Sequence, residues 1–88
     1  MSKPTKMATV IAMSPTGEIV FRDDFEIPHR STLRQIREKG VEVGLALVEK
    51  ILAVPENGLC HEAPARRWIF EILMGSKRTS ATPSDYTF

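Results

Sequence analysis

The longest stretch with a single hydrophobic period lies at residues 31–54. Apolar residues and two glycines recur there at intervals of three and four, the spacing of one face of an α-helix. This first stripe comprises Leu33, Ile36, Gly40, Val43, Gly44, Leu47, Ile51 and Val54. Ser31 or Thr32 can cap the free amide groups at the start, and Pro55 cannot continue the helix. The pattern therefore predicts a central helix over residues 31–54.

A second stripe widens the apolar face of this predicted helix. Its members are Val41, Leu45, Val48 and Leu52, and Arg34 and Arg37 continue it toward the helix start. So wide a face must be covered on more than one side. Two interpretations remain open: the rest of the chain covers both stripes, or the second stripe is a homodimer or partner interface. Gly40 and Gly44 lie on the first stripe and would allow close backbone approach.

The first part of the chain has the short period of β-structure. Residues 7–13 and 18–22 are two β-rich runs around the Ser-Pro-Thr-Gly sequence at 14–17, which is typical of a turn. They predict a β-hairpin whose apolar face lies on the central helix. Asp23 and Asp24 interrupt the alternation, and Phe25 and Ile27 resume it. A bulge or a short third strand is therefore expected at this point, with the aspartates forming a charged sheet edge.

The region after the central helix is predicted to form a second, shorter helix. Pro64 suits a first helical turn, and Gly75 suits the position just beyond the last one. The apolar stripe of this helix comprises Ala65, Trp68, Ile69, Ile72 and Leu73, with Phe70 and Met74 on the other side. The expected architecture is an α+β fold of the order ββαα. Residues 1–6 form a flexible arm, 7–78 a single domain and 79–88 a disordered tail.

Composition and charge narrow the class of protein without identifying it. The 88 residues are 42% hydrophobic and 26% charged with a formal net charge of +1, as expected for a single globular domain. A domain of this size folds with a modest margin, which dimerisation would increase. Cys60 is the only cysteine, which is typical of a reducing compartment such as the cytoplasm. The start has no signal-peptide pattern, and no apolar run is long enough to span a membrane.

Candidate chemistry is sparse, and the sequence predicts a protein that is not an enzyme. The one reactive-looking cluster is Cys60, His61 and Glu62, but neighbours in sequence rarely face one another, and catalytic cysteine signatures are absent. With His29 as the only other histidine, a metal site would have to borrow ligands. No phosphate-binding glycine loop is present. We therefore expect no catalytic residues, no cofactor and no metal.

Nucleic-acid binding is the alternative function that the basic residues indicate. His29, Arg30, Arg34 and Arg37 gather where the positive end of the central helix is expected. A second basic set comprises Arg66, Arg67, Lys77 and Arg78. In a dimer, the two sets could present a basic stripe to phosphate groups or to an acidic partner. The order of strand and two helices resembles ribbon-helix-helix repressors in topology, although those have one strand per subunit and two are predicted here.

Protein binding is the function that the sequence favours. The surplus apolar helix surface, the small size and the absence of catalytic groups are typical of a regulator or inhibitor that occupies a partner surface. Small phage- or plasmid-encoded factors are often of this kind. The predicted partner or homodimer interface is the second stripe: Val41, Leu45, Val48 and Leu52.

Overall fold

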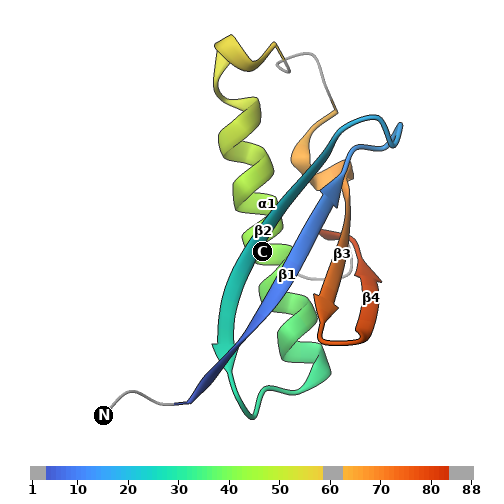
Figure 1. Cartoon of the computed structure of the whole chain (residues 1–88). Coiled ribbons are helices and arrows are strands. Elements are labelled where there is room, and N and C mark those ends of the chain that lie inside the picture. The colour runs from blue at the N-terminus through green and yellow to red at the C-terminus, as the bar shows by residue number, and fades with distance from the viewer. Residues whose placement is uncertain (1–3, 59–62, 84–88) are drawn as a thin grey trace.

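A computed structural model describes residues 4–58 and 63–83, and it shows an α+β fold (Figure 1). One long helix lies against one face of a four-stranded antiparallel sheet. The elements in chain order are β1 (Thr5–Met13), β2 (Val20–Pro28), α1 (Leu33–Leu52), the 3-10 turns Pro55–Asn57 and Ala65–Arg67, β3 (Ile69–Met74) and β4 (Lys77–Ala81). The predicted fold class is confirmed, whereas the predicted second helix is wrong.

The strand order is β2-β1-β3-β4, so the two halves of the chain share one sheet. Strand β1 pairs antiparallel with both β2 and β3, which makes those two parallel to each other. Helix α1 carries the chain across β1 from one to the other, and β4 completes the sheet beside β3. Strands β2 and β4 are therefore the free edges.

The predicted N-terminal hairpin is present, but it is longer and more regular than expected. Pairing between β1 and β2 runs without a break from Met13 and Val20 to Thr5 and Pro28, so there is no bulge and no separate third strand. Asp23 lies on the same face as Phe25 but remains exposed, because β2 is an edge strand. The aspartates thus mark a sheet edge, as predicted, without interrupting the strand.

Helix α1 occupies most of the predicted range and starts at the predicted cap. The Thr32 hydroxyl accepts a hydrogen bond from the Gln35 N–H (3.2 Å), and the Gln35 side chain accepts one from the Thr32 N–H (2.9 Å). This reciprocal arrangement is a capping box. The helix ends at Leu52, and Pro55 begins a short 3-10 turn.

Residues 69–74 form a strand rather than a helix. In this run nearly every residue is apolar, so its spacing fits a buried helix and a buried strand equally well. In the fold, Phe70 and Ile72 point into the core on alternate positions, and Gly75 has the positive φ of 59° in the tight turn that leads to β4. Pairing with β1 stabilises the strand, and no sequence pattern reports that pairing.

Strands β1 and β4 include residues that were expected in the flexible arm and in the disordered tail. Thr5 and Lys6, expected in the arm, begin β1. Residues 79–81, expected in the tail, belong to β4 and pair with β3. Pro83 in the predicted tail is also buried, and residues 84–88 lie outside the described residues.

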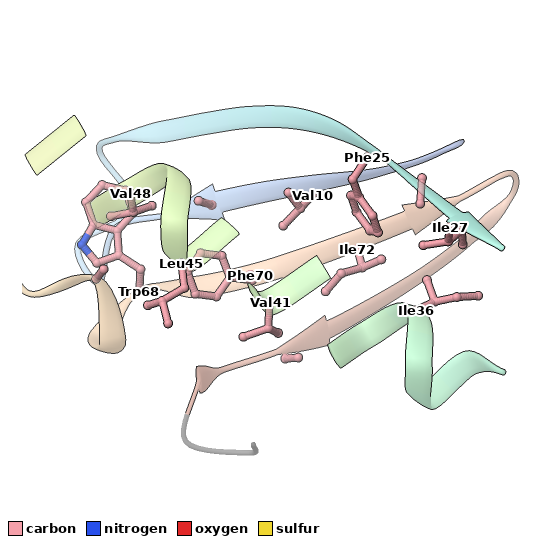
Figure 2. Packing of buried hydrophobic residues seen from close by; sticks show 14 residues of the cluster. Val10, Phe25, Ile27, Ile36, Val41, Leu45, Val48, Trp68, Phe70 and Ile72 are labelled. Carbon is pink, nitrogen blue, oxygen red and sulfur yellow. The ribbon is translucent and has the colours of Figure 1, made fainter. Parts of the chain in front are cut away.

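The core lies between α1 and the sheet, as Figure 2 shows. Phe70 and Trp68 are fully buried, with Val10 and Ile72 also in this core. The Trp68 indole N–H donates to the Ala63 carbonyl (2.9 Å), and the indole ring stacks on Phe21 with a centroid distance of 6.0 Å. Trp68 therefore stabilises the monomer and is not an exposed contact for a partner.

Candidate interaction surfaces

The predicted helix interface faces the chain's own sheet. Val41 and Val48 are 0% exposed and Leu45 is 8% exposed within the single chain, while Leu52 is half-buried. Among the described residues there is one α-helix, and buried residues from both of its stripes cover one sheet face. The second stripe is thus not the free surface that a partner interface requires.

The opposite face of the sheet carries exposed apolar residues. No helix of the described residues packs on it, because α1 and both 3-10 turns lie on the other side (Figure 1). Within the described residues, four large hydrophobic side chains are strongly exposed, and three of them belong to this face: Met7 (58%), Val20 (54%) and Ile69 (42%). We call this surface the uncovered sheet face.

The strand register arranges the uncovered sheet face in cross-strand rows. One row is entirely apolar: Val20, Met13 and Ile69. The next row runs Arg22, Ile11, Glu71 and Ser80, and the third runs Asp24, Thr9, Leu73 and Arg78. The apolar row and the central Ile11 thus form a patch with charges of both signs at its border.

Two interactions hold the charged border in place. The Thr9 hydroxyl donates to the Asp24 carboxylate (2.6 Å), and Arg78 forms an ion pair with Glu71. The pattern that could have indicated this face lies in β1, where Ile11 and Met13 alternate with Val10 and Ala12. A strand that is apolar on both faces is either packed against other elements on both sides or exposes an apolar surface that can bind another molecule.

The structure gathers only part of the predicted basic set. Arg30 and Arg34 are exposed at the N-terminal end of α1, whose first turn contains no acidic residue. Arg37 is half-buried, and its Nη2 donates to the Ser80 carbonyl in edge strand β4 (3.2 Å). Its Nε is shielded from solvent and has no hydrogen-bond partner among the described residues.

Arg66 and Arg67 do not join this set. They belong to the 3-10 turn that precedes Trp68, and Trp68 packs near Val48 toward the other end of α1. From Arg37 to Val48 the helix rises by about 16 Å, at about 1.5 Å per residue. Arg66 and Arg67 therefore lie at the opposite end of the molecule from Arg30 and Arg34 and cannot form one continuous patch with them in a single chain. Lys77 and Arg78, the other members of the predicted second set, lie beside the first turns of α1.

A small hollow opens beside the basic end of α1. It has a volume of about 220 Å³ and lies between the first turns of α1 and the β3–β4 hairpin. Its lining is apolar toward the core and cationic at the hairpin: Leu33, Ile36, Ile72, Met74, Lys77, Arg78 and Thr79. No sequence pattern indicated it, because residues 64–74 were expected to be helical and 79–88 disordered.

The described residues contain no group of side chains suited to a metal ion. No group of three His, Cys, Asp or Glu side chains within residues 4–58 and 63–83 could hold a metal ion. The Cys60, His61 and Glu62 cluster lies outside the described residues. In the described part of the chain, no helix is long and apolar enough to cross a membrane.

Comparison with known proteins adds no family to this description. No protein-family model matches the sequence, and neither the curated proteins nor the solved structures searched contain a significant match.

Proposed function

We propose that this chain is a non-enzymatic, protein-binding regulator or inhibitor that works as a homodimer, and that two copies associate through the uncovered sheet face. The observation that carries the proposal is the distribution of side chains on that face. Apolar residues form its end row, Val20, Met13 and Ile69, and in the next row opposite charges lie on either side of β1. The cytoplasmic location and the resemblance to small phage- or plasmid-type factors stay predictions from the sequence.

The register of the sheet makes this face complementary to itself. Consider two copies face to face, with the two-fold axis parallel to β1. The axis places β2 of one copy over β3 of the other, so Val20 faces Ile69 and Arg22 faces Glu71. Met13 and Ile11 lie near the axis and face their own counterparts. In the first two rows, apolar and charged positions thus meet suitable partners, whereas in the third row Asp24 comes opposite Leu73.

The size of the face determines how stable such a dimer is. Four strands about 4.8 Å apart, with the longest about 30 Å long, give a flat footprint of roughly 500 Å². A standard stable interface buries about 800 Å² per partner. The area buried per partner in the proposed contact is therefore small for a stable interface, even when the surface relief of the side chains is included. We expect reversible, concentration-dependent association.

Arg22→Glu tests the proposal directly. The substitution places a carboxylate at position 22 opposite Glu71 twice in the symmetric dimer, and like charges in apposition oppose association. We expect the wild type to pass from monomer to dimer over a concentration series in sedimentation equilibrium. The Arg22→Glu protein should remain monomeric at concentrations at which the wild type is dimeric.

A charge swap and a matched control complete this experiment. In the double variant Arg22→Glu with Glu71→Arg, opposite charges again meet across the axis, and association should recover. Arg78, whose side chain is 69% exposed, can then turn away into solvent. Lys50→Glu makes the same change of charge on an exposed helix position and should dimerise like the wild type. A wild type that stays monomeric at millimolar concentration contradicts the proposed dimer.

Nucleic-acid binding remains the second proposal, supported by the cationic N-terminal end of α1. Arg30 and Arg34 are exposed there, with no acidic residue in the first helical turn. Two observations oppose a continuous phosphate-binding stripe. Arg37 donates a hydrogen bond to the Ser80 carbonyl, and Arg66 and Arg67 lie at the other end of the molecule. Binding to random duplex or single strands that weakens steeply with added salt would support this alternative.

A further inference from the structure

We propose that the hollow between the first turns of α1 and the β3–β4 hairpin receives one apolar anchor side chain of an acidic peptide segment in a partner protein. This inference rests on the proposed protein-binding function and specifies the chemistry of the partner. The hollow lies on the helix side of the molecule and is separate from the apolar rows of the uncovered sheet face.

The walls of the hollow are suited to an apolar group. Ile36 and Ile72, each 1% exposed, form its inner side at the end of the core. Leu33 forms an outer wall and is 52% exposed, the one strongly exposed large hydrophobic in the described chain that does not belong to the sheet face. Met74 is half-buried and also lines the hollow, where its flexible side chain can adjust to the shape of a guest.

The volume indicates which kind of ligand fits. Pockets for whole small molecules measure about 300–1,000 Å³. At about 220 Å³ this hollow is smaller, and its size matches a single inserted side chain. Anchor side chains of this kind supply most of the binding energy in many protein–protein contacts. An aliphatic or aromatic residue of a peptide is therefore a better occupant than a free metabolite.

The charges at the hollow specify the residues that should flank the anchor. Lys77 and Arg78 line the hollow, and Lys77 forms no ion pair among the described residues. Arg34 follows Leu33 in a helical turn without acidic residues. Glu71 already pairs with Arg78, so it does not neutralise Lys77. Arg78 is directed to Glu71 on the uncovered sheet face, so acidic residues beside an apolar anchor would meet Lys77 and Arg34. The positive end of the helix dipole adds to the attraction.

The apolar character of the hollow also favours a peptide over nucleic acid as the ligand. Phosphate backbones need cations along an extended track, whereas here the lining cations lie on one side, at the hairpin, of an apolar depression of side-chain size. A peptide uses both features at once, because its anchor removes Leu33 and Met74 from water while its carboxylates stay near Lys77 and Arg34. Recognition of acidic motifs by basic clusters is a common mode of peptide binding.

The test is the selection of peptides from a phage-displayed library of random dodecapeptides on the full-length protein. We expect the enriched sequences to contain one large apolar residue with Asp or Glu beside it. A fluorescein-labelled representative should bind the wild type in anisotropy titrations, and replacing its apolar residue with alanine should weaken binding by about tenfold or more.

Two protein variants locate the site. Leu33→Ser removes the outer wall at a position that is half-exposed, so the fold should persist, and Lys77→Glu reverses the rim charge. Each variant should lower the affinity for the selected peptide by about tenfold or more, while Lys50→Glu should leave that affinity unchanged. Circular dichroism of each variant verifies that the fold is retained.

The outcomes separate this inference from the proposed dimer. If Arg22→Glu is monomeric and still binds the peptide, the hollow acts independently of the sheet face. A wild type that stays monomeric overturns only the dimer proposal. The inference is overturned if no acidic, anchor-bearing sequences are enriched, if Leu33→Ser and Lys77→Glu bind like the wild type, or if random oligonucleotides displace the peptide at low salt more effectively than unlabelled peptide does.

Discussion

At the scale of single residues, two glycines set the distance between helix and sheet. A Cβ atom at Gly40 would overlap Ile72 Cγ1, and one at Gly44 would lie 2.6 Å from Phe70 Cδ1 and 3.0 Å from Val10 Cγ2. Separations below 3.0 Å do not occur between such atoms without movement of one of them. The predicted close backbone approach is therefore confirmed, and its partners include side chains of strand β3.

Gly44→Ala should destabilise the protein although alanine is the better helix former. The change gains up to about 1 kcal/mol of helix propensity. The added methyl group would however collide with Phe70, which is fully buried. Overpacking of such a site costs about 1–3 kcal/mol or more, which outweighs the gain. We expect a lower free energy of unfolding in urea denaturation. Glu49→Ala, on the exposed side of the helix, is the control and should change stability by less than about 0.5 kcal/mol. A stabilised Gly44→Ala protein would show that the helix can move away from β3.

At the scale of elements, local signals set the ends of α1, whereas contacts from elsewhere in the chain determined β3. The capping box at Thr32 and the proline after the helix act within a few residues, so both ends could be predicted from the sequence. The run from Ile69 to Met74 contains apolar residues on every side and has no clear period of its own. It became a strand because β1 offers it a free edge.

Thr32→Ala should weaken the start of the helix. It removes the hydroxyl that accepts from the Gln35 N–H, and the loss of such a cap costs about 1 kcal/mol. For a domain of this size, that corresponds to a melting temperature about 4–8 °C lower, measurable by circular dichroism. Thr32→Ser keeps the acceptor and should retain most of the stability. Equal losses in both variants would show that the hydroxyl bond does not stabilise the native helix.

At the scale of the whole molecule, the one helix of the described residues covers one sheet face, and no other described helix covers the second. The buried residues of both helix stripes pack on the face that contains Val10 and Phe70, while Val20 and Ile69 are exposed on the other. The exposed and half-buried apolar side chains in its adjacent rows are more than scattered surface hydrophobics. This imbalance is the physical basis for the proposed dimer.

Association through this face should make thermal stability depend on protein concentration. A partner that binds only the folded chain shifts the unfolding equilibrium by mass action. We expect the melting temperature of the wild type to rise as its concentration is increased, and that of Arg22→Glu to stay constant. If both proteins show a constant melting temperature, the folded chain gains no stability from a second copy.

The sequence alone determined the features that depend on neighbours along the chain. These are the hairpin turn, the helix with its cap at Thr32, the close approach at Gly40 and Gly44, and the α+β class. Each follows from dihedral preferences, local hydrogen bonds or periodicity, which act over a few residues.

The tertiary structure alone decided which surfaces remain free. Whether Val41 and Leu45 face a partner or the chain's own sheet depends on where residues 69–81 pair, and that pairing joins segments more than 50 residues apart in the case of β1 and β3. The uncovered sheet face and the hollow beside Leu33 exist because β3 and β4 extend the sheet in place of a second helix. Which side chains stay exposed depends on how distant segments pair, and for that reason no local pattern could specify these surfaces.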